Sequence, residues 1–326
     1  MKLHALQHPG VIVRKQILIA GMLSFVAVIA PSRALAGFKI VADVTSDPAW
    51  VAENTASGGA LDAAVNSAVA TYQSLFSNNV TVKIAFQWGG SVGGSGSGAA
   101  ALPQVNLLTL AQTEALFVAH AAVHPENIPI NTAVPHLPAT FPNPDPNGSS
   151  NFLITTAERA ALTGVSSGLA SDGTIGFGTS STSAFWAAFA LHEIGHILGR
   201  FDQAFAAPPN PPILTPLDFF KYDPGTMTLD PTFTITNFSY DGGATNPGGR
   251  QWSNVSDSGD WIGFPSDPYN FATNGTAVLS SPDVLLDNAL GFDPAVATAT
   301  PEPATFLLFS MGLAGLAGWR WRANVA

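Results

Sequence analysis

The chain has 326 residues, a formal net charge of −10 and no cysteine. The lack of cysteine excludes disulfides, thiol catalysis and zinc sites built from thiolates. The acidic balance disfavours binding to nucleic acid or to anionic membranes, and it favours solubility outside a cell.

The first 36 residues have the pattern of a secretory signal peptide. Basic residues come first, followed by an apolar run over residues 17–30. Residues 34–36 read Ala-Leu-Ala and supply the small side chains of a cleavage site, which we place after Ala36. Four of the twelve Lys and Arg residues lie in this leader and none of the 22 acidic residues does, so the mature chain is more acidic still.

The residues after the leader alternate between strand and helix patterns. Alternating apolar and polar side chains predict strands, and apolar residues at helical spacing predict helices. Strands are expected at residues 38–44, 80–86 and 151–155, and helices at 61–76, 108–123 and 156–162. Residues 172–178 are expected to form a further extended segment. This order predicts an α+β fold or a mixed α/β sheet.

Two segments between these elements are expected to be loops. Residues 89–98 are rich in glycine and serine, but no Gly-Lys-Ser/Thr follows, so we interpret them as a flexible connector rather than a phosphate-binding loop. Residues 125–146 are rich in proline and predict a surface loop.

His120 and His124 lie four residues apart near the end of the predicted helix 108–123. Such a pair could hold a second metal ion, and His136 is a further upstream histidine. No carboxylate accompanies the pair to act as a base. We therefore interpret both residues as solvated helix histidines.

Residues 192–202 read HEIGHILGRFD and contain the pattern H-E-x-x-H-x-x-G-x-x-D. His192 and His196 are four residues apart, so both rings can reach one ion from a helix. Glu193 lies beside the first ring, where it can contact a metal-bound water without binding the metal. Gly199 can adopt the left-handed conformation that ends a helix.

The motif follows a strongly apolar segment at residues 184–191, with Ser and Thr at 181–183 as candidate N-caps. Together these residues predict an active-site helix over about residues 183–199. Metal ligands that emerge from such an apolar segment indicate a helix that is buried on most sides and open at the metal.

The third metal ligand follows by elimination. No histidine follows the motif, and no glutamate occurs between it and Glu302. Among the aspartates that remain, Asp202 has the right spacing, and Asp218 and Asp223 are alternatives. The upstream histidines could contribute in principle.

With these residues, the chain resembles the metzincin clan of zinc metallopeptidases, in the variant with aspartate as the third ligand. The resemblance implies a metzincin-like zincin of the α+β class that binds one catalytic Zn²⁺. It implies a twisted mixed sheet and an active-site helix above a cleft, with a loop-rich C-terminal subdomain. The strand near residues 172–178 would border the cleft and pair with the substrate backbone.

The same resemblance implies a methionine turn beneath the metal. The other methionines fall in the leader or the tail, so Met227, in the turn-like sequence Asp-Pro-Gly-Thr-Met, is the candidate. The tyrosine that usually follows is missing, and a thioether that fills a core gap is the alternative. Tyr222 and Tyr240 are candidates for a phenol that stabilises the transition state.

The region after the motif is rich in loops. Asp257 and Asp260 could hold calcium, but isolated acidic turns are usually solvated, and no further residue supports such a site. Residues 282–292 predict a closing helix that Gly291 caps.

Pro301-Glu302-Pro303 precedes an apolar stretch at residues 304–319 and then two arginines. The apolar stretch is expected to form a short transmembrane segment of marginal length, and the arginines would hold its end inside the cell. This order resembles the PEP-CTERM sorting signal of Gram-negative bacteria. The resemblance implies that a membrane-embedded exosortase cleaves near the motif; a plain C-terminal anchor is the alternative.

The sequence therefore predicts a signal peptide at residues 1–36, a zinc metalloprotease domain at 37–297 and a sorting signal at 298–326. The layout resembles that of PEP-CTERM-bearing metalloproteases. The expected function is that of a secreted zinc endopeptidase, in which Glu193 acts as general base on a metal-activated water. The alternative is a non-catalytic exported surface or matrix protein built on the same scaffold.

The expected partners follow from this organisation. They are a protein or peptide substrate, signal peptidase and an exosortase during export, and the membrane through transient contact with the C-terminal segment. No nucleic acid is expected. The predicted location is the cell surface or the extracellular matrix of a Gram-negative bacterium.

Overall fold

The computed structural model describes residues 37–141, 151–202, 214–230, 235–252, 259–270 and 277–295. The expected signal peptide, the expected sorting segment with Pro301, Glu302 and Pro303, and Asp257 lie outside these residues. Within the described ranges, no helix has both the length and the apolar character needed to cross a membrane.

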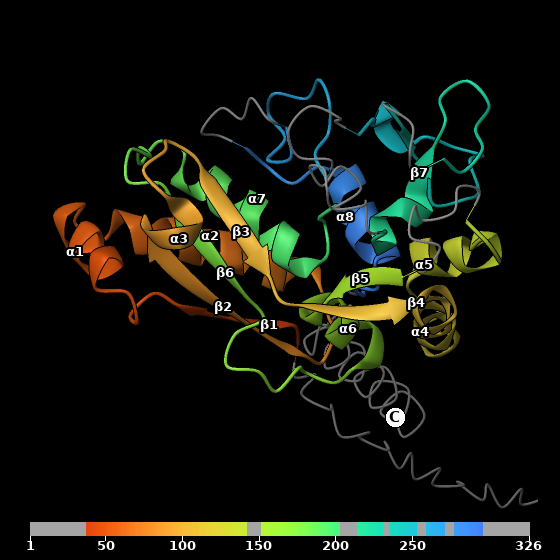
Figure 1. Cartoon of the computed structure of the whole chain (residues 1–326), viewed down its shortest axis with the longest axis horizontal. Helices are drawn as coiled ribbons and strands as arrows, with labels where there is room; N and C mark the ends of the chain where they lie inside the picture. Colours follow the sequence, from red (N-terminus) through yellow and green to blue (C-terminus); the bar gives the residue numbers. More distant parts are fainter. Residues whose placement is uncertain are drawn as a thin grey trace, which may run out of the picture. The chain divides into compact units, whose positions relative to one another are not determined.

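The central sheet has four strands in the spatial order β1-β2-β6-β3 (Figure 1). Their bounds are Lys39–Asp43 for β1, Thr81–Trp88 for β2, Gly173–Phe177 for β6 and Ala99–Pro103 for β3. β1, β2 and β6 are parallel, and β3 runs antiparallel to β6. The prediction of a mixed sheet is confirmed.

The segment at residues 172–178 is extended, as predicted, but the expectation that it pairs with a substrate backbone is wrong. Its strand β6 pairs with β2 on one side and with β3 on the other, and neither side is left for a substrate. The edge strand next to β6 is β3, and β1 forms the other edge of the sheet. Its sequence, AAALP, lacks the apolar–polar alternation that identifies a strand, and only its pairing with β6 reveals its role.

Residues 89–98 were expected to be a flexible connector, but they are folded against β6. They contain the short helix α3 (Gly90–Gly93). A Cβ on Gly176 of β6 would overlap the backbone of Gly93, so the two backbones are in direct contact. Gly178 also donates a hydrogen bond to the carbonyl oxygen of Gly98 at 2.8 Å. The glycines here allow close packing of backbone on backbone.

Helices α2 (Ala60–Leu75) and α7 (Trp186–Leu198) pack against each other and against the sheet. α2 contacts β1, and α7 contacts β6 and the edge strand β3 (Figure 1). The hydroxyl of Tyr72 in α2 donates a hydrogen bond to the carbonyl oxygen of Leu191 in α7, at 2.8 Å. Because α7 carries the histidine motif, this packing places the motif beside the edge of the sheet.

A second, antiparallel pair of strands joins β4 (Val105–Thr109) to β5 (Asn151–Thr155). Thr109 and Gln112 form a capping box, so α4 begins at Leu110, two residues later than the sequence predicted. The remaining elements of this part are α5 (Ile128–Ala133), η1 (Val134–His136) and α6 (Thr156–Thr163).

The described chain after α7 consists of short elements joined by loops, as predicted. These elements are η2 (Pro216–Phe220), β7 (Lys221–Tyr222), β8 (Asn237–Phe238), η3 (Pro247–Gly249) and α8 (Ser281–Ala289). Packed aromatic rings form the core of this region, which has little regular secondary structure. The ring centres of Trp252 and Trp261 are 4.3 Å apart, and those of Phe238 and Trp261 are 5.5 Å apart. α8 packs against α5 and connects this region to the rest.

Helix α1 (Pro48–Ala56) is held in the core by Trp50. This side chain is 0% exposed, its ring centre lies 5.4 Å from that of Phe177 in β6, and its indole N–H donates to Asp62 at 2.8 Å. We expect Trp50→Ala to lower the free energy of unfolding by about 3–5 kcal/mol in urea titrations, because the substitution leaves a large cavity.

Val51→Ala is the matched control for this substitution. Val51 is the next residue of the same helix and is 45% exposed, so we expect a change within about 0.5 kcal/mol. Similar losses for both variants would contradict the placement of Trp50 in the core.

Candidate metal centre

Helix α7 presents the histidine motif from the interior of the fold. Most of its residues are buried, including Glu193 and His196. The helix starts later than predicted, with Phe185 as its N-cap residue and no capping side chain, while Ser181 accepts a hydrogen bond from the indole of Trp186. It ends at Gly199, whose φ of 120° is poorly tolerated by other residues.

The two histidines direct their Nε2 atoms at each other. These atoms are 2.8 Å apart. The side chain of His192 is 16% exposed and His196 is 5% exposed, so the pair lies close to the surface without being open to it. The spacing of four residues on a helix therefore brings both rings to one point.

Each ring is oriented by a hydrogen bond from its other nitrogen. His192 Nδ1 donates to the carbonyl oxygen of Pro268 at 2.8 Å, and His196 Nδ1 donates to that of Arg200. A carbonyl oxygen can only accept, so both Nδ1 atoms carry the proton. In neutral rings the Nε2 lone pairs then face each other, which is the arrangement that a bound cation stabilises.

Glu193 lies beside this pair. Its Oε1 is 3.9 Å from His192 Nε2, and one ligand atom from each of Glu193, His192 and His196 lies within 4.8 Å of the others. The distance of 3.9 Å exceeds that of a direct hydrogen bond. It suits a carboxylate that contacts a water on the metal rather than the metal.

Asp202 lies beyond the end of α7 in a buried ion cluster. Its Oδ2 accepts a hydrogen bond from Lys221 Nζ, which is also 3.1 Å from Asp218 Oδ1. In the part of the chain that the structure describes, the three-residue group around the histidines includes Glu193 and not Asp202. The role of Asp202 as third ligand therefore stays a prediction.

The charged groups of this cluster shift one another's pKa values. Burial raises the pKa of Asp218 to about 7, the charge of Asp202 adds to the rise and Lys221 opposes it. Desolvation acts to lower the pKa of Lys221, but Asp202 and Asp218 together raise it. Lys221 thus stays cationic and fixes the carboxylate of Asp202. Asp223, the other alternative, instead accepts backbone hydrogen bonds from Gly225 and Thr226 in a turn.

Asp260 and Tyr269 lie against His192 and His196, although no sequence pattern predicts these contacts. Asp260 Oδ1 is 3.8 Å from His192 Nδ1, so this residue, considered above as a calcium ligand, is buried beside the motif. The ring centre of Tyr269 is 5.5 Å from that of His192 and 6.3 Å from that of His196. No sequence spacing connects residues 259–270 with α7, and only tertiary packing brings them together.

Met227, Tyr222 and Tyr240 lie in the loop-rich region. Met227 is at the end of a turn after β7, with a φ of 54°, and its sulfur accepts a hydrogen bond from Asn237 at 3.4 Å. Burial, and the charge of Asp241, raise the pKa of Tyr222 to about 12. Tyr240 is half-buried beside Phe238. The expected roles of these residues at the metal stay predictions.

Residues 299–323 match the PEP-CTERM protein-sorting motif. The prediction of a C-terminal sorting signal is confirmed, and this signal indicates export, processing by an exosortase and sorting to the surface of a Gram-negative bacterium. No curated protein and no solved structure matches the chain.

Gly195 lies between the two histidines, and the side chain of Tyr269 leaves no room there for a larger residue. A Cβ at this position would overlap the phenol, whose hydroxyl is 2.5 Å from that of Tyr72. We expect Gly195→Ala to lower the free energy of unfolding by about 1–3 kcal/mol and to weaken metal binding, because Tyr269 must move away from both rings. Thermal unfolding and zinc titration measure the two effects.

Gly225→Ala is the control, since Gly225 lies in an exposed turn and its nearest neighbour would be the flexible carboxylate of Asp223, 3.3 Å away. Unchanged zinc affinity in Gly195→Ala would show that Tyr269 does not position the histidines.

Proposed function

We propose that this protein is an exported zinc-dependent endopeptidase. The observation that carries the proposal is the paired orientation of His192 and His196: both Nδ1 atoms are held by backbone carbonyl oxygens, and both Nε2 atoms meet at one point beside Glu193. The PEP-CTERM signal supports an exported protein. A divalent cation fits this donor set because neutral imidazole nitrogens with engaged outer nitrogens are typical zinc ligands.

Three residues would hold the metal. His192 and His196 contribute Nε2, and Asp202 is the predicted third ligand. Lys221 contacts Oδ2 of Asp202. The other carboxylate oxygen, Oδ1, would therefore be the one that binds the metal. In that arrangement Lys221 would fix the direction in which Asp202 points, as outer partners of metal-binding carboxylates do.

A bound zinc ion supplies Lewis acidity, which makes a water a better nucleophile and polarises a substrate carbonyl. Glu193 accepts the proton of that water as the peptide carbonyl is attacked, and it returns the proton to the departing amine. The burial of Glu193 keeps the carboxylate close to the reacting water and away from competing solvent. Asp260 Oδ1 adds a negative charge 3.8 Å from Nδ1 of His192, whose hydrogen bond goes to Pro268.

The edge strand β3 offers a place for the substrate. Its inner edge pairs with β6, and among the described residues no strand pairs with its outer edge. α7 packs directly against β3. An extended peptide that adds to this edge would lie next to the motif, and main-chain hydrogen bonds would bind it with little dependence on its side chains.

The first test of the proposal is Glu193→Gln. We expect kcat/KM for casein-derived peptides to fall by about 100- to 10,000-fold, because the amide cannot accept a proton. Zinc content should stay unchanged, since Glu193 is not a ligand. Glu53→Gln in α1 is the control and should keep full activity.

Proteolysis at the wild-type rate by Glu193→Gln would overturn the assignment of the general base. A wild-type protein that binds zinc but cleaves no peptide would favour the alternative of a non-catalytic surface or matrix protein.

The second test concerns Asp202. We expect Asp202→Asn to weaken zinc binding by at least about 100-fold, more than the loss of an outer-shell partner does, as measured by competition with a chelator. Asp218→Asn is the comparison, because it removes the other carboxylate near Lys221, which is the alternative ligand without the expected spacing. Equal zinc affinities in these two variants would exclude Asp202 as the third ligand.

A further inference from the structure

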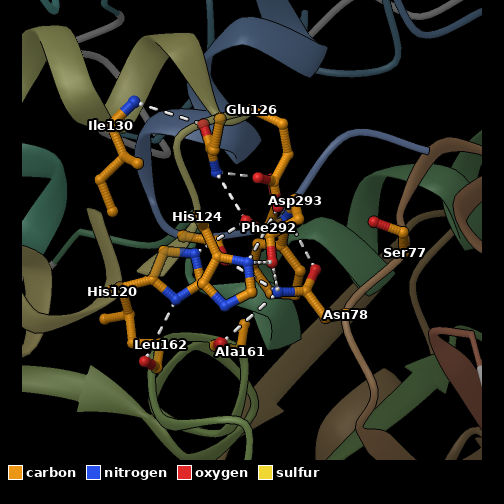
Figure 2. Close-up of polar contacts among 12 residues, drawn as sticks. Ser77, Asn78, His120, His124, Glu126, Ile130, Ala161, Leu162, Phe292 and Asp293 are labelled. Atoms are coloured by element: carbon orange, nitrogen blue, oxygen red, sulfur yellow. Dashed lines mark hydrogen bonds and ion pairs between the residues drawn. The ribbon is translucent and has the colours of Figure 1, made fainter. Parts of the chain in front are cut away.

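A second pair of histidines lies far from α7 in the sequence. His120 and His124, from the last turn of α4 and the residue after it, have parallel rings whose centres are 4.2 Å apart, at an angle of 12°. Figure 2 shows Asp293, from the segment after α8, beside both rings. Asp293 Oδ1 is 2.8 Å from His120 Nε2, and Asp293 Oδ2 is 3.0 Å from His124 Nδ1.

The interpretation of these residues as solvated helix histidines is therefore wrong for His120, which is 2% exposed. The carboxylate that the pair lacks in its own helix comes from a residue 173 positions later. It reaches the pair because α8 packs against α5 and directs the following segment back to α4. We call His120, His124 and Asp293 the α4 cluster.

Asp293 is held in place by amide side chains. Asn78 Nδ2 donates to its Oδ2 at 3.0 Å, and Asn127 Nδ2 donates to its Oδ1 at 3.2 Å. Asn78 also accepts a hydrogen bond from the backbone N–H of Asp293 at 2.7 Å. The carboxylate is 3% exposed, so its position is determined by the fold and not by solvent.

Both ring nitrogens of His120 face oxygen atoms. Its Nδ1 is 3.2 Å from the carbonyl oxygen of Leu162, and its Nε2 is 2.8 Å from the carboxylate of Asp293. With the N–H of a neutral ring at Nδ1, where the carbonyl oxygen can only accept, the lone pair of Nε2 faces Asp293. A cation held by Nε2 and the carboxylate fits this arrangement.

His124 directs a nitrogen at the same carboxylate. Its Nδ1 is 3.0 Å from Asp293 Oδ2 and 3.1 Å from Glu126 Oε1. One nitrogen from each ring and one oxygen of Asp293 lie within 4.8 Å of one another. A single divalent ion at this point would be bound by both rings and by the carboxylate.

We infer that the α4 cluster is a second zinc site with a structural role. His120 Nε2, His124 and Asp293 supply two imidazoles and a carboxylate, a donor set that suits zinc better than calcium or magnesium. The carbonyl oxygen of Leu162 fixes the ring of His120, as the outer partner of a metal-binding histidine does. The ion reaches the site through His124 and Glu126, whose side chains are 35% and 42% exposed.

The zinc ion would fasten the end of the described chain to the rest of the fold. Around Asp293, Ser77 donates a backbone hydrogen bond to the carbonyl oxygen of Asp293 at 2.9 Å, and Ala295 donates to that of Leu75 at 2.7 Å. This segment immediately precedes residues 299–323, which form the sorting motif. The site would thus stabilise the boundary between the folded domain and the sorting signal.

Zinc stoichiometry tests the inference. The protein, produced from the full chain and stripped with a chelator, is reloaded with zinc alone and analysed by elemental mass spectrometry. The double variant His192→Gln/His196→Gln, which lacks the α7 ligands, should retain one zinc ion per chain. Adding His124→Gln should remove that ion, whereas adding His136→Gln, an exposed histidine outside the cluster, should not.

Thermal unfolding of the double variant gives a second measurement that changes no residue of the α4 cluster. Zinc should raise its Tm, and the rise should vanish when His124→Gln is added. A double variant that binds no zinc, or a Tm that does not respond to zinc, would overturn the inference. Neither result depends on whether the α7 site is catalytic.

Discussion

Both histidines of α7 use the nitrogen that faces away from the candidate metal position to donate a hydrogen bond to a backbone carbonyl oxygen. These two bonds decide which tautomer each ring adopts and where its Nε2 lone pair points. The acceptor for His196 is Arg200, immediately after the turn at Gly199, so the end of the helix and the orientation of the ring are set together. The acceptor for His192 is Pro268, in a loop that meets α7 only in the folded protein.

The loop that carries Pro268 is itself held by buried charge and aromatic packing. The guanidinium of Arg200 lies 3.4 Å from the ring centre of Tyr269 and 2.7 Å from Asp283 in α8. Arg200 is 0% exposed, and a buried cation is tolerated only where a carboxylate and aromatic faces replace its water. The residue that provides the carbonyl oxygen for His196 therefore also anchors the loop that supports His192.

The two histidine pairs of this chain have the same sequence spacing but different surroundings in the fold. In each pair the two histidines are four residues apart, and in each pair a ring nitrogen contacts a backbone carbonyl oxygen. In α7 the carboxylate of Glu193 follows its histidine directly and lies 3.9 Å from the ring, which suits the base we propose. In the α4 cluster the carboxylate of Asp293 contacts both rings directly and is held by Asn78 and Asn127, which suits the ligand we infer.

Local sequence patterns were sufficient to predict the positions of the helices and strands that have strong apolar periodicity. The strands at residues 39–43, 81–88 and 151–155 and the helix at 60–75 agree with the predictions to within about two residues, because their apolar spacing is a property of each segment alone. The close approach of His192 and His196 also follows from spacing, since a helix brings residues four apart onto one face.

Tertiary structure determined the other features of the fold and of the histidine sites. The edge strand β3 has no pattern of its own and exists because it pairs with β6. Asp260, Tyr269 and Asp293 reach the histidines from distant segments, through contacts that no local spacing encodes. The sequence by itself determined which histidines lie close together on a helix and that the protein carries a sorting signal. Which carboxylates meet which rings depended on packing, because burial selects partners by their position in space and not by their distance along the chain.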